Sequence, residues 1–379
     1  MNRIIQLFKK ELMLSVSLAA AIIALFITPP DRNFLNSIDW KTLATLFMLL
    51  TVLEGFKKEN IFAPLLRKSK LIKSQFVLTV FFVFSVFCTS MFVTNDVSLI
   101  IFVPLTLILF RAGDKEKYIL PVLTFENIAA IRGSLLMPFG SPQNLFLFTQ
   151  SGIPAADFIL MMLPLWIGSI FLLLLFILFL YRKNLHEQIE FDSSKVDLRL
   201  DKSRAKYRFM YIALFILVII TIITRTKFWP YVTLAVALTL LVFDRKILRQ
   251  TDYVLLLTFF CFFVFSSSIC KNPAVSKFLS ASVSGHEYIW SILLSQIISN
   301  VPASIVLWPF TQNLRALLYG LDSAGLCSII GSLASVINLR LYNREYPGRS
   351  IQFIKTFTWI SLIFFALVVI PQYLIIKAV

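Results

Sequence analysis

Long apolar stretches separated by short polar segments run through the whole chain. A helix needs about 20 mostly apolar residues to cross a membrane. Seven stretches reach or approach this length: 12–29, 41–56, 158–181, 208–224, 229–243, 252–270 and 351–378. Two more, roughly 118–150 and 315–338, are long but interrupted by Gly, Ser, Pro and Asn. We therefore predict an all-α fold with about nine helices that cross a membrane.

Two other apolar runs, 75–110 and 285–310, are broken near their centres by polar residues. Backbone groups freed by such a break are tolerated in a membrane where they face protein or a watery cavity. We predict that each run is a helical hairpin that enters and leaves on one side. Two full crossings in place of each hairpin would leave the rest of the topology unchanged, so this alternative stays open.

The distribution of Lys and Arg supports this segmentation, because cytoplasmic loops carry an excess of both. With the N-terminus inside, 26 basic residues fall on the cytoplasmic side and 7 on the outer side. The cytoplasmic segments are 1–11, 57–74, 111–117, 182–208, 244–251 and 339–350. We predict a multi-pass protein of the cell membrane with a cytoplasmic N-terminus.

The composition excludes most other classes of protein. Of the 379 residues, 58% are hydrophobic and 15% charged, with a mean hydropathy of +0.82. That leaves too few polar residues for the surface of a soluble enzyme, a secreted disulfide module, a disordered chain or a repeat solenoid. The net charge of +16 comes from short basic clusters between apolar runs, so we expect no nucleic-acid partner. Four cysteines without CxxC spacing and two histidines give no disulfide framework and no metal site.

The polar interruptions recur in the same order in both halves, and each half closes with a long apolar helix. On the predicted topology the first hairpin opens to the cytoplasm and the second to the exterior, so the halves are inverted. Inverted repeats with broken helices are typical of secondary transporters, with the site at the repeat interface near the midplane. We predict a first repeat at 1–181, a cytoplasmic linker at 182–207, and a linking helix with the second repeat at 208–379. The alternative is chance similarity, since Gly, Ser and Asn often interrupt helices.

The hairpin centres carry side chains suited to a binding site. Thr94 and Asn95 lie in the first hairpin, and Ser299 and Asn300 lie at the matching place in the second. A tip exposes carbonyl groups at the end of one arm and N–H groups at the start of the next; the N–H end favours an anion. Hydroxyl and amide side chains add donors and acceptors without the cost of a buried charge. We predict that these four residues bind substrate, with the two Asn residues also binding the coupling ion.

The interrupted helices supply a second pair of helix ends. Their breaks contain Gly140-Ser141 with Asn144 in the first half, and Gly331-Ser332 in the second. We predict that Ser141, Asn144 and Ser332 contact the substrate. Carbonyl groups released at Gly140 and Gly331 are suited to coordinate a small cation such as Na⁺.

Few ionisable residues lie within the apolar runs, and each is a functional candidate because an intramembrane charge is costly. Asp96, beside the first hairpin tip, is suited to bind a cation or carry a proton, or else to cap the following helix. Glu126 and Arg132 are possible charge partners in the cytoplasmic half of a cavity. For Arg132, contact with an anionic substrate and a structural ion pair both remain open. Glu54 lies near a helix end, where its side chain can reach the surface.

Taken together, Thr94-Asn95-Asp96, Gly140 to Asn144, Ser299 to Ala303 and Gly331 to Ala334 resemble the signature positions of the ion transporter superfamily. The relevant branches are arsenite permeases, sodium/proton antiporter permeases, citrate-transporter-like proteins and divalent anion/sodium symporters. The resemblance covers nearly the whole chain.

The resemblance implies two inverted repeats whose hairpin tips lie at the site, and a homodimer that moves the site by an elevator-like displacement. In the symporter branch a Ser-Asn-Thr signature at both tips binds Na⁺ and a substrate carboxylate, which points to Asn95 and Asn300. Asp96 and Val301 occupy the third positions here, a departure that brings the chain closer to the arsenite-permease branch.

These observations predict a secondary active transporter for a di- or tricarboxylate or an inorganic oxyanion, coupled to Na⁺ or H⁺ and needing no other cofactor. The alternative is a Na⁺/H⁺ antiporter that uses Asp96. The chain has no GxxxxGK[ST] nucleotide-binding loop. It also lacks the HExxH and GxSxG motifs of enzymes and the charge ring of a channel, so neither of these classes is favoured.

Overall fold

The computed structural model describes residues 12–31, 34–64, 69, 71–189, 202–269 and 271–377. Within these ranges the chain forms 17 α-helices and no β-strand, which confirms the predicted all-α membrane fold. The predicted cytoplasmic segment 1–11 and residues 190–201 of the linker lie outside the described residues.

The first half contains a pair of helices, a hairpin, a broken helix and a long closing helix. The pair is α2 (Leu12–Ile27) and α3 (Trp40–Lys58), and the arms of the hairpin are α5 (Gln75–Val93) and α6 (Asn95–Ala112). The two parts of the broken helix are α7 (Ile119–Gly133) and α8 (Pro142–Ser151), and the closing helix is α9 (Ala155–Tyr181).

The second half repeats this order after an additional helix. Its elements are α10 (Ala205–Ile223), α11 (Trp229–Phe243), α12 (Arg245–Gln250), α13 (Tyr253–Ile269), α14 (Pro273–Val283), α15 (Glu287–Ile298), α16 (Asn300–Leu307), α17 (Leu314–Ala324), α18 (Leu333–Glu345) and α19 (Ser350–Lys377). Short 3₁₀ turns at Phe34–Ser37, Glu116–Tyr118, Lys202–Arg204 and Trp308–Phe310 join some of them. Helix α14 was not predicted from the sequence. Its N-cap residue is Asn272, whose side chain accepts hydrogen bonds from the backbone N–H groups of Ala274 and Val275.

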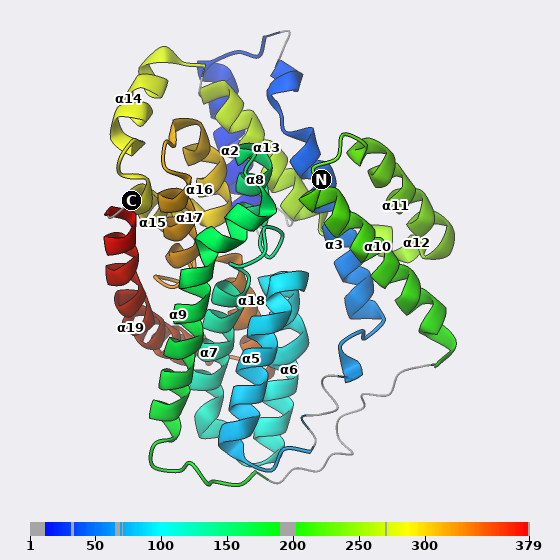
Figure 1. Cartoon of the computed structure of the whole chain (residues 1–379), viewed down its shortest axis with the longest axis vertical. Helices are drawn as coiled ribbons and strands as arrows, with labels where there is room; N and C mark the ends of the chain where they lie inside the picture. The colour runs from blue at the N-terminus through cyan, green and yellow to red at the C-terminus, as the bar shows by residue number, and fades with distance from the viewer. Residues whose placement is uncertain are drawn as a thin grey trace.

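Five helices in the described part of the chain are long and apolar enough to cross a membrane: α5, α6, α9, α10 and α19. A sixth is added if α13 and α14 form one bent span. The other uninterrupted stretches predicted to cross also form helices, but α2 and α11 are shorter and α3 carries more charge. Both arms of the first hairpin are therefore long enough to cross, although they lie side by side in one half of the molecule (Figure 1).

The two hairpins and the two broken helices form the centre of the molecule. In Figure 1, α5, α6, α7 and α18 occupy the lower half, and α8, α15, α16 and α17 the upper half. The first arm of each hairpin packs against the broken helix of its own half, as α5 does on α7 and α15 on α17. The second arm of each hairpin also packs against the broken helix of the other half, as α6 does on α18 and α16 on α8. The hairpins thus approach the middle of the molecule from opposite ends.

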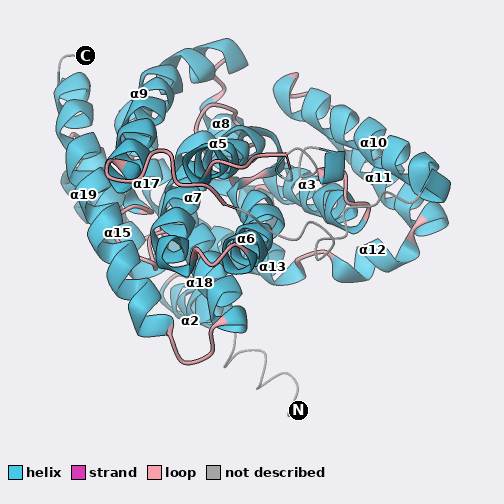
Figure 2. Cartoon of the chain, turned by 90° about the horizontal axis from the view of Figure 1, so that it is seen from below, coloured by secondary structure: helices cyan, strands magenta, loops and turns pink. Residues whose placement is uncertain are grey.

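Helices outside this centre flank it on two sides. Seen from below in Figure 2, α3 and α10 to α12 lie on one flank, and α9 and α19 lie on the other. Within the first flank α10 and α11 pack on α3, while α2 packs along α13. Large apolar side chains of α9, α10, α11 and α19 point outward, as expected for surfaces that face lipid.

The buried apolar residues form two separate clusters. Along the first broken helix, Ile131 belongs to one cluster and Leu135 to the other. Along the second, the change occurs between Leu321 and Leu326. In both broken helices, the residues before the break therefore pack in one apolar cluster and those beyond it in the other. The buried polar side chains lie near these breaks.

Candidate functional site at the hairpin tips and helix breaks

The tips of the two hairpins share one unusual backbone conformation. Thr94 has φ 70° and ψ 156°, and Ser299 has φ 70° and ψ 158°. This region of φ/ψ space is populated almost only by glycine, and a residue held there costs about 1–3 kcal/mol. Such strain is found mainly at functional sites. Two equivalent non-glycine residues in the same strained conformation point to a shared role for the tips.

The breaks of the two long helices also match each other. A Cβ atom added to Gly140 would lie 2.2 Å from the carbonyl oxygen of Ser134, and one added to Gly331 would lie 2.2 Å from that of Ala324. Glycine is therefore required at both positions for the backbone to fold back on itself. The next residue at each break, Ser141 or Ser332, is extended and directly precedes a helix.

Four helix N-termini result from these tips and breaks. The N-cap residues are Thr94 of α6, Ser299 of α16, Ser141 of α8 and Ser332 of α18. All four carry hydroxyl groups and all are buried, yet within the described structure none of these side chains caps its own helix. The first N–H groups of a helix need partners from outside the helix. The sequence therefore places capping residues where their hydroxyl groups remain free for another partner.

The second tip is docked onto the second break. The backbone N–H of Asn300 donates to the carbonyl oxygen of Gly331 at 3.3 Å, and its Nδ2 lies 3.4 Å from the carbonyl oxygen of Leu321. At the first tip, Asn95 Oδ1 accepts from the backbone N–H of Asp96 at 2.9 Å. Both Asn side chains are buried, and in the described part of the chain no hydrogen bond joins them.

The first break contains polar atoms without partners. Neither the amide oxygen nor the amide nitrogen of Asn144 has a hydrogen bond within the described residues, and the same holds for the Ser141 hydroxyl. Asn144 and Ser141 are both 0% exposed. Leaving such groups unpaired costs about 1–3 kcal/mol each, so this arrangement is suited to bind a polar solute.

Asp322 was missed by sequence analysis. It lies in α17, three residues before the C-cap residue Gly325, and is only 2% exposed. Its Oδ1 accepts from Nε2 of Gln143 at 3.0 Å, and its Oδ2 has no hydrogen-bond partner in the described structure. The rule that singled out Asp96, that a charge within an apolar stretch is costly, applies equally to Asp322.

Arg132 lies at the end of α7, just before the first break. Its Nε donates to Ser169 Oγ of α9 at 2.8 Å, and its Nη1 to Ser323 Oγ of α17 at 3.4 Å. Ser323 in turn donates to Gln372 Oε1 of α19 at 2.7 Å. Asp322 is close enough to interact electrostatically with the guanidinium. The hydrogen bonds of Arg132 in the described structure therefore go to neutral hydroxyl groups, and its two predicted roles, contact with an anion and a structural ion pair, stay predictions.

The other ionisable candidates, Asp96, Glu126 and Glu54, contact residues other than Arg132 and Asp322 in the described structure. Asp96 follows Asn95 in the first turn of α6, whose N-cap is Thr94, so Asp96 is not the cap residue. Its charged neighbours are Lys57 and Asp252, at the ends of α3 and α13. Glu126 is fully buried and accepts from Thr106 of α6, while Glu54 pairs with Lys57 on α3. Among the described residues, no group of three His, Cys, Asp or Glu side chains is placed to hold a metal ion.

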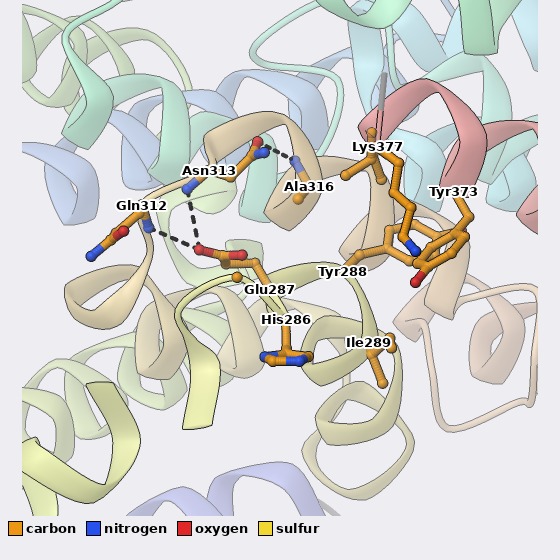
Figure 3. Close-up of a pocket in the computed structure, with 11 residues that line it drawn as sticks. His286, Glu287, Tyr288, Ile289, Gln312, Asn313, Ala316, Tyr373 and Lys377 are labelled. Atoms are coloured by element: carbon orange, nitrogen blue, oxygen red, sulfur yellow. Dashed lines mark hydrogen bonds between the residues drawn. The ribbon is translucent and has the colours of Figure 1, made fainter. Parts of the chain in front are cut away.

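The base of the second hairpin contains a cavity of about 300 Å³, far along α15 from its tip (Figure 3). Glu287 accepts there from the backbone N–H groups of Gln312 and Asn313, at 3.1 and 3.3 Å. Lys377 lies over the ring of Tyr373 on the other side of the cavity. Glu287 thus fixes the hairpin base to the segment that leads into α17.

A carboxylate fixes the base of the first hairpin as well. Glu187 accepts from Lys115 Nζ at 2.8 Å and from the Tyr118 hydroxyl at 2.7 Å, in the segment that leads into α7. Its backbone carbonyl accepts from the N–H of Gln75. The hydrogen bonds from Lys115 and Tyr118 lower the pKa of Glu187 to about 2. Both hairpins are therefore held at the base and strained at the tip.

Comparison with known proteins identifies the family. A profile described as citrate transporter matches residues 4–331. The chain is 32% identical over 333 residues to a protein of Methanocaldococcus jannaschii named uncharacterized transporter MJ0456, covering 86% of this chain and 88% of that protein. It is also 29% identical over 354 residues to the inner membrane protein YbiR of Escherichia coli, covering 92% of each chain.

The family profile covers both hairpins, the first broken helix and the second as far as its break at Gly331. The resemblance to citrate-transporter-like members of the ion transporter superfamily is thereby confirmed. The protein is a membrane transporter and not an enzyme. The chain belongs to the citrate transporter family.

Proposed function

We propose that this protein is a secondary active transporter that moves an anion across the cytoplasmic membrane, coupled to Na⁺ or H⁺. The anion is a di- or tricarboxylate or an inorganic oxyanion; citrate, succinate, phosphate, sulfate and an oxyanion of arsenic are the candidates. The observation that carries the proposal is the set of four buried helix N-termini whose N-cap hydroxyl groups do not cap their own helices.

The chemistry of these N-termini favours an anion over a neutral solute. Each helix N-terminus carries a partial positive charge and N–H groups that point along the axis. The hydroxyl groups of Thr94, Ser141, Ser299 and Ser332 add neutral donors for carboxylate or oxyanion oxygens. The amide groups of Asn95, Asn144 and Asn300 complete the set. We assign the carbonyl groups at Gly140 and Gly331 to the coupling cation; the oxygen of Gly331 also accepts from the backbone N–H of Asn300.

We expect the transporter to act as a homodimer in the lipid bilayer, as the superfamily resemblance implies. Helices α10 and α11 expose large apolar side chains along most of their length, Phe209, Ile216 and Phe243 among them. This surface is suited to lipid or to a second copy. Crosslinking of membranes through cysteines placed on α11 tests the dimer, and exclusively monomeric protein would contradict it.

Uptake into proteoliposomes tests the function. Purified protein is assayed with citrate, succinate, phosphate, sulfate and arsenite, under imposed Na⁺ or H⁺ gradients. At least one anion should accumulate, and Asn95→Ala and Asn300→Ala should each reduce its uptake by about tenfold or more, the effect of removing one hydrogen bond to a charged group. Asn272→Ala, at the N-cap of α14, is a matched control and should transport normally. Uptake unaffected by both tip variants would exclude this site.

A second candidate is a Na⁺/H⁺ antiporter that uses Asp96. It is favoured by one observation, because Asp96 lies next to the first tip and its Oδ1 is buried without a hydrogen bond among the described residues. In everted vesicles with a fluorescent pH indicator, an antiporter would move protons when Na⁺ is added, and Asp96→Asn would abolish the signal. No proton movement, together with intact anion uptake, would exclude this alternative.

A further inference from the structure

Each broken helix carries one buried charge just before its break. Arg132 is the penultimate residue of α7, and Asp322 lies two residues before the end of α17. Their exposed fractions are 1% and 2%. Both lie where the broken helices pass from one apolar cluster to the other. The opposite charges of the two repeats are therefore brought to one buried layer.

The two charges interact without forming an ion pair in the described structure. Arg132 is held instead by the hydroxyl groups of Ser169 and Ser323, which are neutral. Asp322 receives one hydrogen bond, from Gln143, and its second oxygen remains unpartnered among the described residues. A buried ionised carboxylate with a free oxygen is costly, and binding a proton there removes the cost.

Asp322 is the only carboxylate among the groups that we identify around this pair, so it is the group that we expect to gain and lose a proton. The titratable side chains that face this pair are Tyr288 of α15 and Tyr319 of α17. The other polar neighbours, Gln143 and Asn144 of α8, Ser169 of α9 and Gln372 of α19, are neutral. The fixed positive charge of Arg132 disfavours Na⁺ at this place, whereas a proton forms a covalent O–H bond with the free oxygen.

Asp322 is also connected to the proposed anion site. Gln143, its donor, lies between Ser141 and Asn144, the two residues with unpartnered polar atoms at the N-terminus of α8. While Asp322 is ionised, it balances the charge of Arg132. Once Asp322 is protonated, the layer has a net positive charge and attracts an anion at the neighbouring helix N-terminus more strongly.

We propose that Asp322 carries the coupling proton and that Arg132 is the counter-charge that Asp322 and the transported anion share. This inference rests on the proposed function and assigns its coupling ion. A proton from water binds the free carboxylate oxygen as the anion binds, and both leave on the other side of the membrane. Because linkage is reciprocal, protonation and anion binding strengthen each other.

The test compares Asp322→Asn, which mimics the protonated residue, with Asp157→Asn, at an exposed position in the first turn of α9, as a matched control. Wild-type protein in proteoliposomes should accumulate an anion of the panel when the lumen is alkaline. Its apparent affinity should fall as the pH rises, by up to about tenfold per pH unit, the limit for one linked proton. Asp322→Asn should retain anion exchange with a flat pH profile and lose accumulation driven by the pH gradient. Asp157→Asn should behave as wild type.

Arg132→Gln separates the two roles, because it removes the counter-charge and keeps hydrogen-bonding groups. It should weaken the apparent affinity for the anion at every pH. Asp322→Asn that still accumulates anion from a pH gradient would overturn the proposal, as would wild-type uptake driven by Na⁺ alone. Wild-type protein that moves none of the anions would refute the proposed function itself, and this inference with it.

A measurement on wild-type protein covers the case in which Asp322→Asn fails to fold. The transported anion is titrated into detergent-solubilised protein in weak buffer at about pH 8, well above the pKa of ordinary carboxyl groups. A pH indicator should report proton uptake that saturates together with anion binding. Anion binding without proton uptake would overturn the proposal.

Discussion

Gln143 donates a hydrogen bond from Nε2 to Oδ1 of Asp322 at 3.0 Å. Gln143 is the second residue of α8, just after the first helix break, and Asp322 lies just before the second. The bond therefore joins the break of one repeat to that of the other. Asn127 of α7 and Ser335 of α18 form a second such bond at 3.0 Å. The two broken helices are thus fastened to each other by polar side chains inside the membrane-spanning part of the protein.

Replacing Gln143 with Ala should destabilise the protein, because it removes the buried hydrogen bond to Oδ1 of Asp322. A hydrogen bond to a charged group contributes about 1.5–3 kcal/mol. The thermal midpoint of detergent-solubilised protein should fall measurably. Gln150→Ala is the control: Gln150 also donates to a carboxylate, that of Asp39, but is exposed, so its loss should cost less than about 0.5 kcal/mol. If the two variants lowered the thermal midpoint equally, the hydrogen bond between Gln143 and Asp322 would not contribute to stability as a buried bond should.

Thr94→Gly and Ser299→Gly should leave the thermal midpoint unchanged or raise it. Glycine relieves the strain of the positive φ angle, which offsets its higher backbone entropy in the unfolded chain. Transport should nevertheless fall, because each variant removes a hydroxyl group from the proposed site. The expected result is a stable protein with reduced uptake.

Thr89→Gly is the control for this pair. Thr89 lies in the same helix as the first tip, five residues earlier and in helical conformation, where glycine costs about 1 kcal/mol. Its thermal midpoint should fall. If Thr94→Gly lowered the midpoint as much as Thr89→Gly does, the tip would not have the conformation described above.

Gly140→Ala and Gly331→Ala should both destabilise the protein and abolish transport. The new Cβ atom would overlap a backbone carbonyl oxygen, which cannot move aside as a flexible side chain can. The breaks would open and displace Ser141 or Ser332. Gly168→Ala is the control, because nothing lies within 4 Å of its added Cβ and alanine favours the surrounding helix α9. Thermal melting and uptake of the three variants check this prediction. A Gly140→Ala protein with wild-type stability and uptake would contradict the close approach of Gly140 to the carbonyl oxygen of Ser134.

Much of the fold could be predicted from the sequence, because the lipid environment constrains it strongly. A helix in a membrane must be apolar for most of its length, so apolar runs mark the helices. The polar interruptions at Thr94 and Ser299 marked the hairpin tips, where α5 and α15 end. Helix α14 was not predicted because it is short and polar on one side, and many loops share these features.

The site was harder to predict, because hydrogen bonding and burial depend on contacts between distant segments. Asp96 was predicted as a coupling residue from its position beside Asn95, and nothing in the local sequence indicates that its charged neighbours are Lys57 and Asp252. Asp322 lies 179 positions from its partner Gln143, and nothing in the local sequence connects the two. The strained φ angles of Thr94 and Ser299 likewise have no sequence signal, since glycine would be expected there.

The carboxylate that fixes the first hairpin base gives a prediction about pH. Hydrogen bonds from Lys115 and Tyr118 lower the pKa of Glu187 from 4.5 to about 2. The folded protein therefore binds the Glu187 proton less readily than the unfolded chain does. The contribution to stability is fully present above about pH 4.5 and is lost as the pH falls toward 2. Acidification should loosen the hairpin base in the wild-type protein.

Glu187→Gln removes this contribution at neutral pH, so the variant should melt at a lower temperature than the wild type at pH 7. The two melting curves should converge as the pH approaches the lowered pKa, because the wild-type carboxyl group is then protonated and equally neutral. Glu116→Gln, an exposed position beside Lys115, is the control and should keep the wild-type difference between neutral and acidic pH. Thermal midpoints measured in detergent across this range provide the comparison. A constant gap between Glu187→Gln and wild type down to pH 3 would contradict the role of Lys115 and Tyr118, since the lost stability would then not depend on the charge of Glu187.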